Sequence, residues 1–174
     1  MAISRIPSKE ECKAILLKYN APDSVIKHCL IVTEIAEEFC NRIPQIDKDI
    51  VIAGAMLHDI GRSIDHSIRH AIEGAKILQE EYIDQRIISI VKKHIGTGIT
   101  QAEAEKLGLP IDDYMPHTNE EILVSYADNL ACENKRCSFE KTLENFISKF
   151  GRESHVVKGF YRQKEIIESI LENN

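Results

Sequence analysis

Residues 47–61 read DKDIVIAGAMLHDIG and form the most apolar helix that the sequence predicts. Asp47 stands at the position of an N-cap, and residues 50–57 are apolar on every side of the helix. Such a helix belongs in the middle of a domain, because a surface helix keeps one polar face. His58 and Asp59 end this helix just before Gly61, so an imidazole and a carboxylate are expected beside the core.

Further helices are predicted on both sides of this central helix. Ser8-Lys-Glu-Glu11 has the sequence of a capping box that opens a helix to about residue 18, and the segment after Pro22 has helical spacing up to Asn41. Helical spacing continues at about 68–80, 84–95, 100–107, 118–131, 138–150 and 153–171, without an alternating strand pattern. We therefore predict an all-α fold, a single compact helical bundle of seven to nine helices, with residues 1–174 as one domain.

The charge balance argues against a polyanionic partner. The chain carries 22 Lys and Arg against 28 Asp and Glu, a net charge of −6, without a block of like charges. Such a field repels long nucleic acids and acidic membranes. A small anionic substrate is still compatible with this charge, because a bound divalent ion dominates the local field.

The cysteines and the N-terminus predict a cytoplasmic protein. The five cysteines are scattered and lack a C-x-x-C pair, so we expect small buried thiols in a reducing compartment rather than a disulfide framework. The first residues lack an apolar signal core, and no stretch approaches the roughly 18 apolar residues of a membrane span.

Several histidines and aspartates fall on the apolar faces of the predicted helices. His28, for example, lies three residues after Val25 and four before Val32, within the buried stripe of its helix. Burying such groups costs free energy unless they find partners. The set comprises His28, His58, Asp59, His70, His94 and Asp128.

Each of these residues also has a simpler interpretation. A lone inward histidine is usually a hydrogen-bonded core residue, Asp59 could only terminate its helix, and His70 could be a surface residue. Four histidines and two aspartates without a matching set of inward Lys or Arg nevertheless favour a metal centre. Nitrogen and carboxylate ligands without thiolate suit one or two divalent transition metal ions, namely Fe, Mn, Co, Ni or Zn, with Mg as a further option.

The order of these residues resembles the H…HD…H…H…D signature of the HD-domain superfamily, in its six-ligand form. The resemblance covers about residues 20–135, which implies an HD-domain core with the C-terminal helices 138–172 packing on it. The segment HAIEGAKIL, residues 70–78, is also similar to the H-x-x-x-G-A-x-x-L stretch of HD-GYP phosphodiesterases and of HD-type dinucleoside polyphosphate hydrolases. This similarity favours His70 over His66 as a ligand, and His66 remains the alternative because it lies only four residues earlier.

The resemblance implies a division of ligands between two metal ions. One ion is held by His28, His58, Asp59 and Asp128, and Asp59 bridges to a second ion held by His70 and His94. The reaction of such proteins is hydrolysis of a phosphate ester by a metal-activated water. The resemblance therefore also implies that Asp59 is a catalytic residue in addition to a metal ligand.

Two further residues near this signature are candidates for catalysis. Arg62 is a candidate phosphate clamp, or else an exposed loop residue, and Asp65 is a candidate proton donor or partner of a histidine. His117 and His155 are predicted to be surface residues.

These points predict a metal-dependent phosphohydrolase that acts on a nucleotide or other small phosphorylated metabolite, with a homodimer as one possible assembly. The chain lacks a Gly-Tyr-Pro motif and an adjacent histidine pair at His94, so an HD-GYP type of cyclic dinucleotide phosphodiesterase is not supported. Two alternatives remain, a di-iron oxygenase of the HD type and a non-catalytic module that binds metal or nucleotide.

Overall fold

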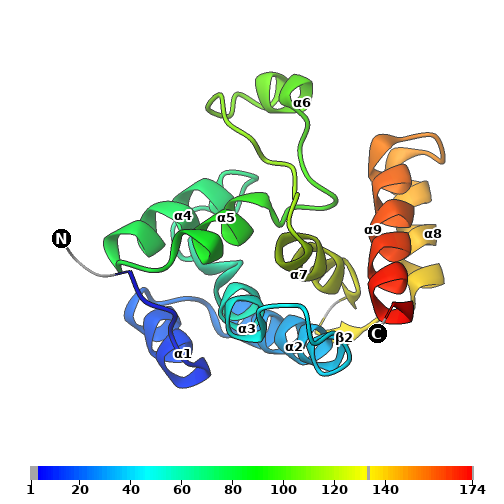
Figure 1. Cartoon of the computed structure of the whole chain (residues 1–174). Coiled ribbons are helices and arrows are strands. Elements are labelled where there is room, and N and C mark those ends of the chain that lie inside the picture. The colour runs from blue at the N-terminus through cyan, green and yellow to red at the C-terminus, as the bar shows by residue number, and fades with distance from the viewer. Residues whose placement is uncertain (1–3, 133, 174) are drawn as a thin grey trace.

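The computed structural model describes residues 4–132 and 134–173. Within these residues it contains nine α-helices, one 3₁₀ helix and one short β-hairpin (Figure 1). In chain order the elements are α1 (Lys9–Lys18), α2 (Asp23–Cys40), α3 (Lys48–Leu57), η1 (Ile60–Ser63), α4 (His70–Glu80), α5 (Gln85–Lys93), α6 (Gln101–Lys106), α7 (Asn119–Asn129), β1 (Ala131–Cys132), β2 (Lys135–Arg136), α8 (Phe139–Phe150) and α9 (His155–Glu172). The predicted all-α fold is confirmed.

Helix α3 lies at the centre of the bundle. Every residue from Ile50 to Leu57 is buried, and α3 packs against α1, α2, α5 and α7. The amide of Ile50 donates a hydrogen bond to Oδ1 of Asp47 at 3.3 Å, so Asp47 is the predicted N-cap. Because α3 is surrounded by other helices, the residues at its C-terminal end are held beside the core.

Helices α8 and α9 form a hairpin, and α9 packs on α7. In Figure 1 the two helices stand side by side at one end of the bundle, far from α1. Phe160 of α9 is completely buried, and its ring centroid lies 4.6 Å from that of Phe139, 5.2 Å from that of Phe146 and 5.6 Å from that of Tyr126. This aromatic cluster joins the hairpin to α7.

The β-hairpin is a feature that the sequence analysis misses. Strands β1 and β2 pair antiparallel, and Cys132 and Cys137 beside them form a disulfide. The expectation of free thiols is therefore wrong for these two residues, whereas Cys12, Cys29 and Cys40 are free and buried. Two-residue strands are too short to produce an alternating pattern, which is why they escape prediction.

The described helices include none that is long and apolar enough to cross a membrane.

Gly61 allows η1 to approach the start of α4 closely. A Cβ atom at this position would lie 1.8 Å from the carbonyl oxygen of His70 and 2.5 Å from the amide nitrogen of Gly74. Both are backbone atoms, so no change of rotamer would relieve the overlap. The approach holds Asp59 and His70 next to each other, with His70 Nε2 3.1 Å from Asp59 Oδ1.

Gly61→Ala should therefore lower the free energy of unfolding by about 1–3 kcal/mol, the usual cost of overpacking. Gly54→Ala is the control, because its Cβ would meet only the side chain of Ile90, at 2.8 Å, and alanine favours a helix over glycine by about 1 kcal/mol. Urea unfolding followed by circular dichroism measures both. Equal losses in the two variants would contradict the assignment of a rigid contact between η1 and α4.

Candidate metal centre

Six side chains from separate elements of the bundle converge beneath its surface. They come from α2, from the end of α3, from the start of α4, from the residue after α5 and from α7. Four of them are buried, while the side chains of His28 and Asp128 are 22% and 18% exposed. The cluster is therefore open to solvent on the side of these two residues. Its members are His28, His58, Asp59, His70, His94 and Asp128.

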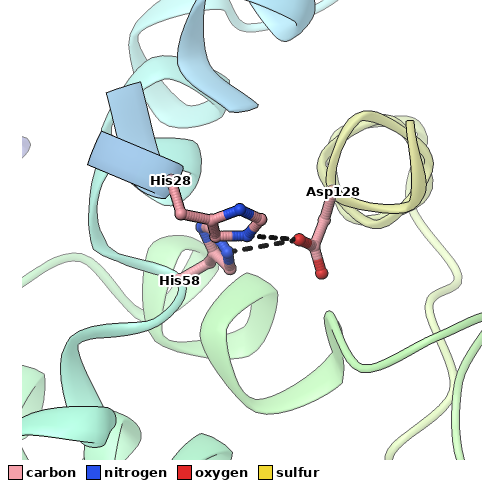
Figure 2. A group of neighbouring side chains, drawn as sticks. All are labelled: His28, His58 and Asp128. Carbon is pink, nitrogen blue, oxygen red and sulfur yellow. Dashed lines mark hydrogen bonds and ion pairs between the residues drawn. The ribbon is translucent and has the colours of Figure 1, made fainter. Parts of the chain in front are cut away.

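One half of the cluster is formed by two imidazoles and a carboxylate of α7. Figure 2 shows the rings of His28 and His58 pointing toward Asp128, which lies on the facing helix. Asp128 Oδ1 lies 2.8 Å from His28 Nε2 and 3.5 Å from His58 Nε2. The ligand atoms of these three residues all lie within 4.8 Å of one another, which is close enough for one metal ion to contact all of them.

Asp59 lies between this half and a second pair of histidines. Its Oδ2 is 3.8 Å from His58 Nε2 and 3.9 Å from His28 Nε2, whereas its Oδ1 is 3.1 Å from His70 Nε2 and 3.4 Å from His94 Nε2. The two oxygens of one carboxylate therefore face two different pairs of imidazoles. This is the arrangement that a bridging carboxylate requires.

Backbone carbonyls fix which nitrogen of each buried ring faces the cluster. Nδ1 of His58 lies 2.8 Å from the carbonyl oxygen of Ala55. The corresponding distances are 2.6 Å from His70 Nδ1 to the carbonyl oxygen of Ser67 and 2.7 Å from His94 Nδ1 to that of Val91. In all three the carbonyl belongs to the residue three positions earlier. A carbonyl only accepts, so each Nδ1 is protonated and donates to it, and a neutral ring then presents the lone pair of Nε2.

These lone pairs need a cation. Nε2 of His70 and Nε2 of His94 lie 3.1 Å apart, and two lone pairs at this distance repel each other. His58 Nε2 and Asp59 Oδ1 are buried without a hydrogen-bond partner among the described residues. Buried polar atoms of this kind are normally satisfied, so the residues fit a divalent ion with nitrogen and oxygen ligands.

Electrostatics keep both carboxylates ionised. Burial alone would raise the pKa of Asp59 and of Asp128, but the neighbouring imidazoles outweigh burial and hold both pKa values below their ordinary range. His58 acts on both carboxylates, His70 on Asp59 and His28 on Asp128. Burial lowers the pKa of His94, which favours the neutral ring that a metal ion requires.

Arg62 lies against the cluster. Its Nε donates to Asp59 Oδ2 at 2.8 Å and its Nη1 to the carbonyl of His66 at 3.3 Å, with a third of the side chain exposed. The sequence analysis finds no matching set of inward Lys or Arg and names Arg62 as a candidate phosphate clamp or an exposed loop residue, and the structure pairs Arg62 with Asp59. The spacing of three residues between Asp59 and Arg62 is the signal that points to it.

The other predicted positions lie outside the cluster. Asp65 accepts a hydrogen bond from the amide of Ser67 at 2.6 Å, which supports the turn before His70. His66 is exposed, so the structure brings His70 rather than His66 into the cluster. His117 and His155 have side chains that are 63% and 40% exposed and pair with surface carboxylates.

Several known proteins are similar to this chain. A tRNA (cytidine(56)-2'-O)-methyltransferase of Thermoplasma volcanium is 46% identical over 83% of this chain, which spans only 42% of that protein. A protein of Methanocaldococcus jannaschii without an assigned function is 38% identical over 90% of this chain and 95% of its own length. Ribonuclease Y of Thermosipho melanesiensis is 27% identical over 79% of this chain and 24% of its own length.

A solved structure shares the fold. The HD domain of the L. monocytogenes phosphodiesterase PgpH, in complex with cyclic-di-AMP, has a TM-score of 0.59 at 18% identity, over 92% of this chain and 91% of that domain. At this identity the likeness concerns the fold alone.

These relatives correct three expectations. Two relatives are named as tRNA methyltransferases. They contradict the expected hydrolysis of a small phosphorylated metabolite and the expected assignment as a phosphohydrolase. They also contradict the exclusion of nucleic acids as partners. The physical reason is that the H…HD…H…H…D pattern encodes ligands rather than a substrate. Net charge, in turn, averages over a surface on which local cations still bind an anion.

The family follows from the cluster and from its position in the chain. The family model described as HD domain matches residues 25–132. All six side chains of the cluster lie within this range, on helices that meet around the buried α3. The chain belongs to the HD-domain family.

Proposed function

We propose that this chain is an RNA-modifying domain that binds tRNA and presents a metal centre to the ribose–phosphate backbone. The observation that carries the proposal is the convergence of four imidazole Nε2 atoms and two carboxylates in one cluster, open at His28 and Asp128. The choice of tRNA rests on the relatives, two of which are named tRNA methyltransferases and others ribonuclease Y. Methyl transfer belongs to relatives of which the matched part of this chain covers only 42–43%, so for this chain it is part of the proposal.

We assign the ligands as the resemblance implies. One divalent ion is held by His28, His58, Asp59 and Asp128, and a second by Asp59, His70 and His94. Bound there, divalent ions supply positive charge that polarises an oxygen of the RNA backbone. The protein's own part is to turn Nε2 of three imidazoles toward the cluster, through hydrogen bonds from Nδ1 to carbonyls three residues earlier, and to bury those rings away from bulk water.

Arg62 is proposed to bind a phosphate of the RNA. Its guanidinium has five donors in a planar arrangement, and the described hydrogen bonds use only Nε and Nη1. The pairing with Asp59 directs the group toward the cluster, so the same phosphate would meet positive charge from the arginine and from a bound metal ion. A cytoplasmic location, as the sequence predicts, fits a role with tRNA.

Asp59→Ala should remove most of the bound metal, because it deletes the carboxylate that faces both pairs of histidines. Elemental analysis of protein purified without chelator measures the ratio of metal to protein and identifies the metal. Asp49→Ala is the matched control, because Asp49 is an exposed aspartate on α3, the helix just before Asp59, and its loss should leave the ratio unchanged. A normal metal content in Asp59→Ala would refute the bridging role.

His70→Ala should lower the metal content from two ions to one, since His70 Nε2 faces only Asp59 and His94. His66→Ala should retain both ions, because its side chain is exposed and only its carbonyl contacts Arg62. The same elemental analysis compares the two variants. If His66→Ala lost an ion and His70→Ala kept both, the two histidines would have to be exchanged in the assignment.

Metal-loaded protein should bind an unmodified tRNA transcript at least tenfold more tightly than duplex DNA of similar length, measured by filter binding. Arg62→Ala should weaken tRNA binding about tenfold and reduce the slope of log K against log salt by about one, as expected for one lost phosphate contact. Arg86→Ala, at an exposed ion pair with Asp47 and Asp84, is the control. Equal affinity for tRNA and DNA would overturn the proposed function.

The same samples, supplemented with a sulfonium methyl donor that leaves as a thioether once its methyl group is transferred, report on the reaction. Mass spectrometry of the recovered tRNA distinguishes an added methyl group at a cytidine from an intact, unmodified RNA. Because the longer relatives carry additional sequence, methylation by this chain alone or only with a partner protein would both fit an RNA-modifying domain. If the RNA is neither modified nor cleaved with any of Mn, Fe, Co, Ni or Zn, only a binding role remains for this chain.

A further inference from the structure

Helix α9 packs against the loop that follows His94. Figure 1 shows α9 beside α7, on which it packs, and α9 lies outside residues 25–132, the range that the family model matches. A Cβ atom on Gly159 of α9 would lie 2.4 Å from Oγ1 of Thr97, which is three residues after His94. The C-terminal hairpin therefore contacts the segment that leads directly away from a residue of the metal centre.

Helix α7 holds the same loop through two hydrogen bonds. The carbonyl oxygen of Gly96 accepts from Ser125 Oγ at 2.8 Å and from Asn129 Nδ2 at 2.7 Å. Ser125 and Asn129 are four positions apart, so they share one face of α7. Asp128 directly precedes Asn129. The turn of α7 that carries Asp128 is thus bonded to the loop that follows His94.

Gln163 of α9 closes these bonds into a hydrogen-bond ring, made by Gly96, Ser125, Asn129 and Gln163. Its Nε2 donates to Ser125 Oγ at 2.7 Å, and its Oε1 accepts from Asn129 Nδ2 at 3.1 Å. A carbonyl only accepts, so Ser125 uses its one proton on Gly96. Gln163 must then donate to Ser125 and turn its oxygen toward Asn129. The hydrogen-bond ring therefore has a single consistent orientation of its donors and acceptors.

The hydrogen-bond ring is buried between helices that already pack through apolar side chains. Ser125 has no exposed surface and Gln163 is 4% exposed. Apolar groups of the same shape would hold α9 to α7 about as well, because buried polar groups lose hydration that their hydrogen bonds only partly return. Hydrogen bonds are directional, however, so they fix the relative position of the segments that they join. Metal ligands require such precision, since they must be held within about 0.5 Å of their working geometry.

The segments that the hydrogen-bond ring joins support both halves of the cluster. His94 Nε2 lies 3.4 Å from Asp59 Oδ1, in the half assigned to the second ion. Asp128 Oδ1 lies 2.8 Å from His28 Nε2, in the half assigned to the first. A shift of the loop at Gly96 along α7 would therefore move one half of the cluster relative to the other.

We propose that Gln163 is a positioning residue of the metal centre. By holding Ser125 and Asn129, it fixes the loop after His94 against the turn that carries Asp128, and it thereby sets the separation of the two metal ions. The inference rests on the proposed function, from which it takes the assignment of two ions. It gives the C-terminal hairpin a part in the metal centre although the hairpin supplies no ligand to it.

Gln163→Met tests this role in the full-length protein. Methionine keeps the length of the side chain and removes both of its hydrogen bonds. Protein freed of metal is titrated with Mn²⁺, and free Mn²⁺ is followed by electron paramagnetic resonance. The weaker of the two dissociation constants should rise about tenfold, as for other residues that orient metal ligands. At saturating Mn²⁺ the magnetic coupling between the two ions should change as well, because it depends on their separation.

Ile167→Val is the matched control. Ile167 lies one turn further along α9, is 1% exposed and packs in the apolar core instead of the hydrogen-bond ring. The loss of one buried methyl group should lower the melting temperature by about 2–4 °C and leave both dissociation constants and the magnetic coupling unchanged. Wild-type metal binding and coupling in Gln163→Met would overturn the inference, and so would equal weakening of metal binding in the two variants.

Ser125→Ala provides the same test if Gln163→Met does not fold. This smaller change disconnects Gln163 from Gly96 on one side of the hydrogen-bond ring and leaves the bond from Asn129 in place. The weaker dissociation constant should again rise, and adding Gln163→Met where the double variant folds should raise it less than the sum of the two single effects. Unchanged metal binding and coupling in Ser125→Ala would overturn the inference.

The Mn²⁺ titration contains no RNA, so failure of this inference is distinguishable from failure of the proposed function. Equal affinity for tRNA and duplex DNA would refute the proposed function, yet weaker binding of one ion in Gln163→Met would still support the positioning role. A preference for tRNA together with normal binding of both ions in Gln163→Met would refute only the role of Gln163. Uptake of a single Mn²⁺ by the wild-type protein would also overturn the inference.

Discussion

Two imidazole nitrogens whose lone pairs face each other impose the main constraint on this structure. Nε2 of His70 and Nε2 of His94 lie 3.1 Å apart, and both Nδ1 atoms are already committed to backbone carbonyls. Neutral rings in this position repel, and both rings lie within 3.4 Å of the Asp59 carboxylate. A proton on one ring would satisfy one contact only. Four imidazoles and two carboxylates together match divalent ions, which explains why an apolar core tolerates six polar side chains.

The fold serves this constraint through its backbone. Helix α3 is buried along its whole apolar length, so His58 and Asp59 are held at a fixed depth, and Gly61 lets the start of α4 approach within a distance that no side chain would permit. Each buried ring is oriented by the carbonyl three residues earlier, at the end of a helix or in the turn that begins one. Helix ends leave such carbonyls without a partner inside the helix. Here these carbonyls accept a hydrogen bond from Nδ1 of each ring, and they thereby fix which ring nitrogen faces the cluster.

The sequence predicts the helices and the cluster well because both depend on side-chain spacing. The apolar residues 50–57 and the inward His28, His94 and Asp128 follow from helical periodicity, and the structure brings all six predicted side chains together. The sequence predicts less well those features of the structure that depend on the conformation of the backbone. The carbonyls that orient the rings have no sequence signature, the β1–β2 hairpin is too short for a pattern, and the Arg62–Asp59 pair depends on the turn geometry of η1. The relation to RNA enzymes is not contained in the ligand pattern at all.

The substrate must therefore be selected by residues around the metal centre. Proteins as different in name as a tRNA methyltransferase and ribonuclease Y are similar to this chain over most of its length, and the HD domain of a phosphodiesterase, solved in complex with cyclic-di-AMP, shares its fold. A metal ion attracts any phosphate, so it cannot choose among them. Discrimination requires contacts that only one ligand can complete. In this chain the segment after His94 continues directly from a residue of the cluster, and the α8–α9 hairpin packs on α7, which carries Asp128, so both are placed to make such contacts.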